Sequence, residues 1–135
     1  MPAAAEAKVF RGETAQGRAA SVVVGTDSLV RRVRVGWRAR CHEGRFVDRT
    51  DFTRPFDSST TNAVADQGVY RIRQRGGWRA RVTVRLRGRR IFDAAHPRRE
   101  TWRGTLRAEV LVSRRGNYVD TCTLRRLRWR ARLVP

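Results

Sequence analysis

Arginine is the residue type with the greatest chemical potential in this sequence. Lys8 is the only lysine, so thirty of the thirty-one basic residues are arginine, and with twelve acidic residues the formal net charge is +19. Residues 1–30 are balanced, so the entire excess lies in residues 31–135. A guanidinium carries a planar fork of donors that matches phosphate, sulfate and carboxylate. The composition therefore predicts a polyanionic partner; a GC-rich genome and simple solubility are the alternative explanation.

Few other residues are spaced for chemistry. The run Cys41-His42-Glu43 places a thiol beside an imidazole, but a zinc site needs four ligands at recurring spacings and no second cluster exists. Asp93 and His96 could form an acid–base pair in a loop, yet no positioned nucleophile or oxyanion motif accompanies them. We expect no metal, no cofactor and no catalytic residue, and keep a hydrolase using the Asp93–His96 loop as a distant alternative.

Three segments position twelve of the thirty arginines, because each alternates apolar residues with arginine at nearly every second position. The apolar phases are Val33, Val35, Trp37, Ala39 and Cys41; Trp78, Ala80, Val82, Val84 and Leu86; and Leu127, Trp129, Ala131 and Leu133. Successive side chains of a strand point to opposite faces, whereas a helix would scatter these arginines around its circumference. Each segment is therefore predicted to be a strand with one dry face and one arginine face.

Weaker strands fit around these three, at residues 9–12, 18–24, 46–52, 69–73 and 102–112. Turn signals separate them: Gly25-Thr26-Asp27-Ser28, Gly76-Gly77, Gly88-Arg89-Arg90 and Gly116-Asn117. A phase shift between Leu124 and Leu127 predicts a β-bulge near Arg125. The pattern favours an all-β fold of about eight strands, an antiparallel β-sandwich or flattened β-barrel. Residues 9–133 form a single domain, with residues 1–8 disordered or loosely attached.

The alternation also predicts which side chains are buried and which bind. The core is expected to contain Trp37, Trp78, Trp102, Trp129, Val82, Val84, Leu106 and Val110. One continuous basic face is expected to contain Arg34, Arg38, Arg79, Arg81, Arg85, Arg126, Arg128 and Arg130. Arg103 and Arg107 would extend this face. Such rows of guanidinium groups can neutralise several phosphates or sulfates at once.

Cys41 and Cys122 are the only cysteines. An even count in a small secreted domain suggests a disulfide, and two buried thiols in a cytosolic protein are the alternative. Both lie in the apolar phase near strand ends, so a bond would place their Cα atoms within about 7 Å of each other.

Short motifs resemble those of uncharacterised bacterial, largely actinobacterial, secreted β-domains. The run at residues 10–17, Phe-Arg-Gly-Glu-Thr-Ala-Gln-Gly, is similar to their F-x-G-x-T-x-Q-G start, and a strand ending at Cys41 follows. Gly104-Thr105-Leu106-Arg107 and the segment from Cys122 to Ala131 are similar to later strands of those domains. The resemblance covers roughly residues 9–132 and implies an exported β-sandwich with a Cys41–Cys122 bridge. It implies no known activity.

We therefore expect a non-enzymatic domain that is exported to the extracellular space or the cell envelope. It would bind anionic polymers, such as envelope polymers or other sulfated or phosphorylated polymers, without integral membrane contact. The alternative is a cytoplasmic protein that binds nucleic acid without sequence preference.

Overall fold

The computed structural model describes residues 6–92, 94–96 and 99–135 and confirms an all-β fold. The three strictly alternating segments lie within long strands, because alternation lets one face of each strand leave water. The strands are β1 (Lys8–Thr14), β2 (Ala19–Val24), β3 (Val30–Arg40), β4 (Arg45–Thr53), β5 (Ser58–Ser59), β6 (Ala63–Gln74), β7 (Trp78–Ile91), β8 (Thr101–Arg114) and β9 (Asn117–Leu133). A 3₁₀ turn, η1, at Arg75–Gly77 connects β6 and β7.

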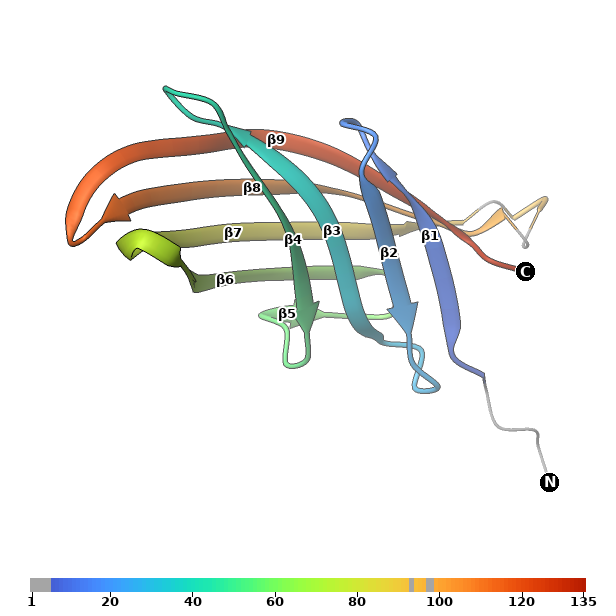
Figure 1. The fold of residues 1–135 in the computed structure, drawn as a ribbon. Coiled ribbons are helices and arrows are strands. Elements are labelled where there is room, and N and C mark those ends of the chain that lie inside the picture. The colour runs from blue at the N-terminus through green and yellow to red at the C-terminus, as the bar shows by residue number, and fades with distance from the viewer. Residues whose placement is uncertain (1–5, 93, 97–98) are drawn as a thin grey trace.

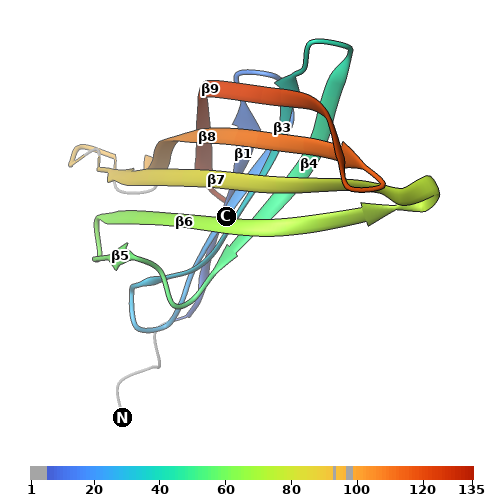
Figure 2. The same cartoon turned by 90° about the vertical axis from the view of Figure 1, so that its left-hand side faces the viewer.

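One antiparallel sheet contains every strand, in the order β4-β3-β2-β1-β9-β8-β7-β6-β5. This sheet folds over itself into two layers, and β1–β4 cross in front of β6–β9 in Figure 1. Figure 2 shows the same crossing after a quarter turn. The long β9 joins the layers, since it pairs with β8 along most of its length and with β1 near its C-terminal end. The result is a β-sandwich made from a single folded sheet.

The apolar phases of both layers meet in one core. Trp37, Trp102 and Trp129 are buried, as predicted, and Val82, Val84, Leu106 and Val110 are buried with them. Trp78 is only partly buried, because it begins β7 beside the turn and stacks under the Arg114 guanidinium. The register of the strands is therefore as expected, with one tryptophan at the rim of the core instead of inside it.

Two glycines make room for one of these tryptophans. Gly88 faces Gly104 across β7 and β8, and Gly104 faces Trp129 across β8 and β9. A Cβ at Gly104 would come within 2.4 Å of the Trp129 ring, and one at Gly88 within 3.1 Å. The predicted turn at Gly88–Arg90 is wrong, because β7 continues through it to Ile91. Glycine here marks a close approach inside a sheet and not a reversal of the chain.

The bulge predicted near Arg125 is confirmed. The β8–β9 register shifts between Leu106, which faces Leu127, and Ala108, which faces Leu124. Arg125 and Arg126 therefore share the position opposite Arg107, and both side chains are exposed. The extra residue adds a guanidinium at this point of the sheet.

Besides the pairing of β9 with β1, the two layers are joined at two further places. At one end β3 pairs directly with β9, where Arg40 faces Thr123, and the next register pair is the Cys41–Cys122 disulfide. The Cα atoms of the two cysteines are 4.0 Å apart, so the predicted bridge is confirmed. At the open edge, the Tyr70 hydroxyl on β6 donates to Asp48 on β4 at 2.6 Å.

The structure describes the N-terminal segment only in part. The first strand already begins at Lys8, and residues 1–5 of the expected loose segment lie outside the described residues. One hydrophobic cluster of the described residues runs through both layers.

Candidate functional site

The outer face of the β6–β9 layer is covered with arginine side chains. These arginines occupy the phase opposite to the core positions, and all of them are exposed. We call this surface the arginine face and define it by Arg71, Arg73, Arg79, Arg81, Arg85, Arg87, Arg89, Arg103, Arg107, Arg125, Arg126, Arg128, Arg130 and Arg132. It includes six of the eight arginines predicted from the sequence.

Strand register arranges these side chains in rows across the sheet. Arg89 faces Arg103, which in turn faces Arg130 on β9. Arg85 faces Arg107 in a second row, which ends at the bulge. Neighbouring strands lie about 4.8 Å apart and alternate residues about 6.7 Å apart along each strand. The face is thus a lattice of guanidinium groups at spacings set by the backbone.

Few acidic side chains lie beside this lattice: Glu13 of β1 faces Arg130 at its edge, and one further acid lies within it. In the described part of β6–β9, Glu109 is the only acidic residue at an outward-facing position, and it lies between Thr83 and Thr123. No ion pair joins any arginine of the face to a carboxylate among the described residues. Like charges directly opposite each other on a sheet are destabilising. A polyanion laid on this face would remove that repulsion.

Two hollows lie along the part of the face that β7, β8 and β9 form. The larger, of about 670 Å³, is bounded by arginines of β7, β8 and β9 together with Glu13 and Thr14 of β1. The second, of about 570 Å³, lies around the bulge and is bounded by Arg85, Arg107 and Arg125 among others. Arg126 borders both hollows, so they adjoin. Together they form a shallow, strongly basic trough across three strands.

The other two predicted arginines lie elsewhere. Arg34 and Arg38 are on β3, in the layer that crosses in front of β6–β9 (Figure 1). The Arg34 side chain points outward from β3 and bonds to Asp51 of β4, so the core lies between it and the arginine face. The expectation of one continuous face is therefore wrong for Arg34. Arg38 lies two residues before Arg40, where β3 pairs with β9. Alternation along a strand gives the phase of a side chain but not the layer in which its strand lies.

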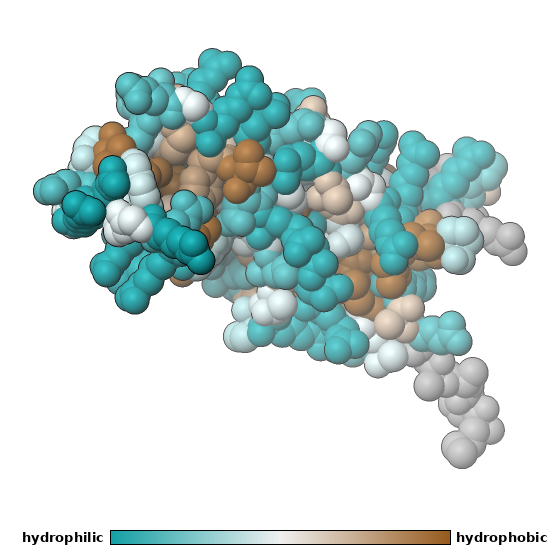
Figure 3. Space-filling view, in the orientation of Figure 1, coloured by the Kyte–Doolittle hydropathy of each residue, from teal (hydrophilic) through white to brown (hydrophobic). Residues whose placement is uncertain are grey.

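Unlike the arginines of the arginine face, Arg34 forms an ion pair with a carboxylate. Its Nε and Nη2 atoms donate to the two carboxylate oxygens of Asp51 on β4, at 2.5 and 3.2 Å. The hydrogen bond from Arg34 lowers the pKa of Asp51 and raises the pKa of the guanidinium. A second pair, Arg54 with Asp27, lies at the edge of the same layer. In Figure 3, hydrophilic side chains cover most of this side of the molecule and apolar groups show in separate small patches.

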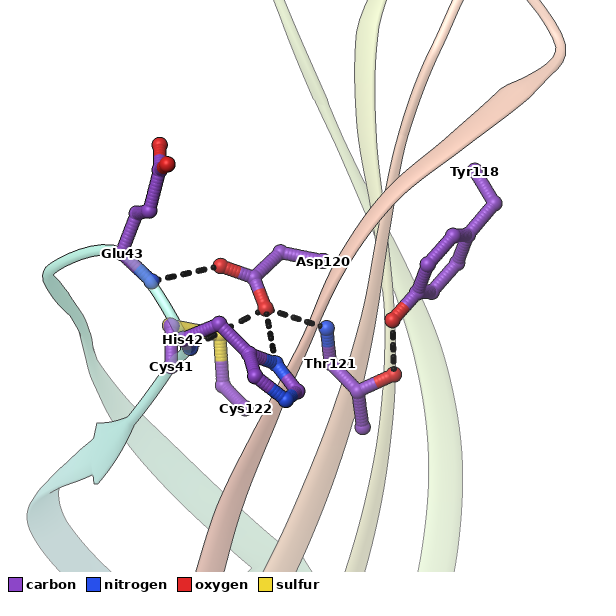
Figure 4. Close-up of a disulfide and its surroundings, with 7 residues drawn as sticks. All are labelled: Cys41, His42, Glu43, Tyr118, Asp120, Thr121 and Cys122. Carbon is purple, nitrogen blue, oxygen red and sulfur yellow. Dashed lines mark hydrogen bonds and ion pairs between the residues drawn. A yellow bond between two sulfur atoms is a disulfide. The ribbon is translucent and has the colours of Figure 1, made fainter.

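The disulfide end contains the best-connected carboxylate of the described residues (Figure 4). Asp120 accepts hydrogen bonds from the backbone N–H groups of His42, Glu43 and Thr121, and its Oδ1 lies 2.9 Å from the His42 Nδ1. These donors, led by the Glu43 N–H, lower the pKa of Asp120 to about 2. The ring of His42 is otherwise open to solvent. These hydrogen bonds hold the turn after β3 against β9.

Of the pair Asp93 and His96, the structure describes only the histidine. Asp93 lies outside the described residues, and His96 is exposed, with its carbonyl accepting the Arg99 N–H. No group of histidine, cysteine and acidic residues able to hold a metal occurs in the described ranges. No helix within those ranges is long and apolar enough to cross a membrane.

The face predicted from the sequence left out several of its arginines, although the alternation of residues 69–73 indicates the direction of two of them. The expected strand at 69–73 places Tyr70 and Ile72 in its apolar phase, and both pack against the core. Arg71 and Arg73 must then point outward beside β7. The sequence pattern does not give the order of the strands. Because β6 is the neighbour of β7 in the sheet, these two arginines belong to the face.

Comparison with protein-family models, curated proteins and solved structures found no match for this chain. The site is therefore interpreted from its own geometry.

Proposed function

We propose that this protein is a non-enzymatic, exported β-sandwich that binds anionic polymers through the arginine face. The main support is a set of exposed guanidinium groups on four adjacent strands, β6–β9, without ion pairs among the described residues. Each anion of a bound polymer would release counterions, which drives association at low salt. Envelope polymers and other sulfated or phosphorylated chains supply such repeated charges.

Several features favour phosphate or sulfate recognition over base recognition. Trp37, Trp102 and Trp129 are in the core, so within the described residues they offer no platform for stacking bases. Binding of single-stranded nucleic acid commonly combines basic grooves with such aromatic platforms. Guanidinium rows on a sheet contact backbone anions and carry no sequence information.

Export is part of the proposal, and the Cys41–Cys122 disulfide supports it. Stable disulfides form and persist mainly in oxidising compartments outside the cytosol. Nucleic acid, the main alternative partner, would be met more readily inside the cell. An extracellular or envelope location therefore fits the chemistry of this chain better than a cytoplasmic one.

A binding panel measured across a salt series tests the proposal. The panel contains heparin, teichoic acid, DNA, RNA and anionic lipid vesicles. If about six anionic groups are engaged, log K falls against log salt with a slope of about −5. A flat salt dependence for every polymer would contradict the proposal, and preferential binding of DNA or RNA would favour the nucleic-acid alternative.

Matched variants locate the binding to one layer. Arg85→Gln with Arg128→Gln removes two charges from the trough and should reduce the magnitude of the slope by about two. Arg32→Gln with Arg49→Gln removes two exposed charges from the opposite layer and should leave the slope unchanged. All four side chains are exposed, so both variants should fold. If the slope of log K against log salt fell equally in the two variants, the arginine face would bind polymer no differently from the exposed arginines of the opposite layer.

A further inference from the structure

Four arginines form a separate cluster at the end of the arginine face nearest the 3₁₀ turn. Arg71 faces Arg81 and Arg73 faces Arg79 across β6 and β7. The four therefore stand in two opposed pairs, with Cβ atoms about 5 Å apart within a pair and the pairs about 6.7 Å apart along the strands. We call this cluster the arginine cradle.

The cradle borders uncharged side chains on its other side. On β8, Leu111 continues the row of Arg81, and Ser113 continues the row of Arg79. Tyr118 of β9 faces Ser113, and its hydroxyl lies 2.9 Å from the Thr121 hydroxyl. Leu111 is 40% exposed and Tyr118 65% exposed. The surface thus changes from strongly basic to apolar within two strands.

A hollow of about 370 Å³ lies over this boundary, bounded by the four arginines, Leu111, Ser113 and Tyr118. That volume falls at the lower end of the range for small-molecule sites. It exceeds what a single phosphate group needs. The shape therefore suits an anionic group attached to an uncharged ring.

The cradle carries its positive charge without compensation. None of its arginines has a carboxylate partner among the described residues. The outward-facing Glu109 stands opposite Thr83, one outward position along β7 from Arg81. Opposed arginine pairs repel each other across the sheet, and an anion between them would convert that repulsion into attraction.

We propose that the arginine cradle binds a phosphorylated sugar unit. The phosphate accepts paired hydrogen bonds from guanidinium groups of the cradle, as the planar fork of arginine favours. The sugar ring lies against Leu111 and Tyr118, where an aromatic ring offers an apolar surface with a polar tip. This inference rests on the proposed function, since it gives the arginine face a subsite for one repeating or terminal unit of an anionic polymer.

Calorimetric titration of the intact protein at low salt tests this site. Glucose 1-phosphate and adenosine monophosphate should bind at least about fivefold more tightly than inorganic phosphate, and glucose should not bind. Both phosphorylated ligands contain the sugar phosphate, and the tighter one identifies whether its source is a glycan or a nucleotide. Inorganic phosphate binding as tightly as glucose 1-phosphate would overturn the proposal.

Three variants separate the parts of the site. Arg71→Gln with Arg81→Gln should raise the Kd for glucose 1-phosphate about tenfold, whereas Arg103→Gln with Arg130→Gln, which lie outside the hollow, should change it less than about twofold. Tyr118→Ala should weaken glucose 1-phosphate about fivefold and leave inorganic phosphate unchanged. Equal effects of the two arginine variants would overturn the site.

The outcome is distinguishable from that of the proposed function. If heparin binds with a steep salt dependence but sugar phosphates do not bind, the cradle is overturned and polymer binding stands. If sugar phosphates bind and no polymer binds, polymer binding is overturned and the cradle stands.

Discussion

The two layers of the sandwich share one core but differ in how their outer charges are balanced. Residues 8–54, which include β1–β4, have eleven basic and five acidic residues, and Arg34–Asp51 and Arg54–Asp27 pair there. Residues 58–133, which include β5–β9, have twenty arginines and five acidic residues. Arg90 pairs with Glu100 there, whereas no ion pair joins the described arginines of the arginine face to a carboxylate.

This difference indicates that arginine content alone does not define a binding surface. Codon preference explains why a basic residue is arginine in either layer. It does not explain why Arg34 on the outer face of one layer has a carboxylate partner, whereas the arginine face of the other layer has none and its Arg90–Glu100 pair lies apart from that face. Repulsion on an unpaired face has a free-energy cost, which a bound polyanion would offset.

The largest expected effect concerns the bond that holds the two unlike layers together. Replacing Cys41 and Cys122 with alanine should lower the free energy of unfolding by about 2 to 5 kcal/mol, because the bridge restricts the unfolded chain across 81 residues of sequence separation. Urea denaturation measures this. An unchanged midpoint would mean that β9 and its pairing with β1 suffice to join the layers.

The next effect is confined to the β6–β9 layer. Gly104→Ala should destabilise the protein by about 3 kcal/mol, since its Cβ would collide with the Arg87 carbonyl and the Trp129 ring. Gly68→Ala on β6 is the control, because its Cβ would meet only the Val84 methyl group, at 4.0 Å. Similar melting temperatures for the two variants would disprove the packing of Trp129 over Gly104.

A smaller effect is expected at the join between the layers and depends on pH. The pKa of Asp120 is lowered to about 2 in the folded protein, so its stabilising contribution is present above its ordinary pKa and is lost as the pH falls through about 2. Asp120→Asn should therefore lower the Tm by a few degrees at pH 7, and the difference should vanish near pH 2. A difference that stays constant across this range would assign the effect to packing instead.

The sequence predicted strands better than it predicted the surface that they form. Strict alternation located β3, β7 and β9, and the phase shift before Leu127 located the bulge. Alternation could not show that β3 lies opposite β7, because layer assignment depends on pairing between residues far apart in the chain. Gly88 was misinterpreted for a related reason: its close neighbour, Trp129, is on another strand, so the local sequence suggested only a turn.

The hydrogen bonds across the open edge could not be predicted at all. Tyr70 was expected in the apolar phase, and it does pack against the core. Its hydroxyl, however, bonds to Asp48 and Thr50 of β4, in the other layer. Burial, followed by the Asp48 contact, raises the pKa of Tyr70. Only the three-dimensional crossing of β4 and β6 brings these groups together.

The smallest expected effect has opposite signs in the two layers. Arg85→Thr removes repulsion with Arg107 and should raise the Tm by about 2 °C, while Arg34→Thr removes the pair with Asp51 and should lower it by a similar amount. High salt should shrink both differences. Differential scanning calorimetry resolves changes of this size, and shifts of the same sign would mean that charge pairing does not distinguish the layers.

The most direct test of the arginine face is a footprint of the bound polymer on both layers. Phenylglyoxal modifies exposed arginines, and mass spectrometry can quantify the modification at each position with and without heparin. Bound heparin should slow the modification of Arg85, Arg107 and Arg128 at least about fivefold and leave Arg32 and Arg49 unchanged, because only the first three lie on the arginine face. Equal protection of both layers, or protection of neither, would contradict the account.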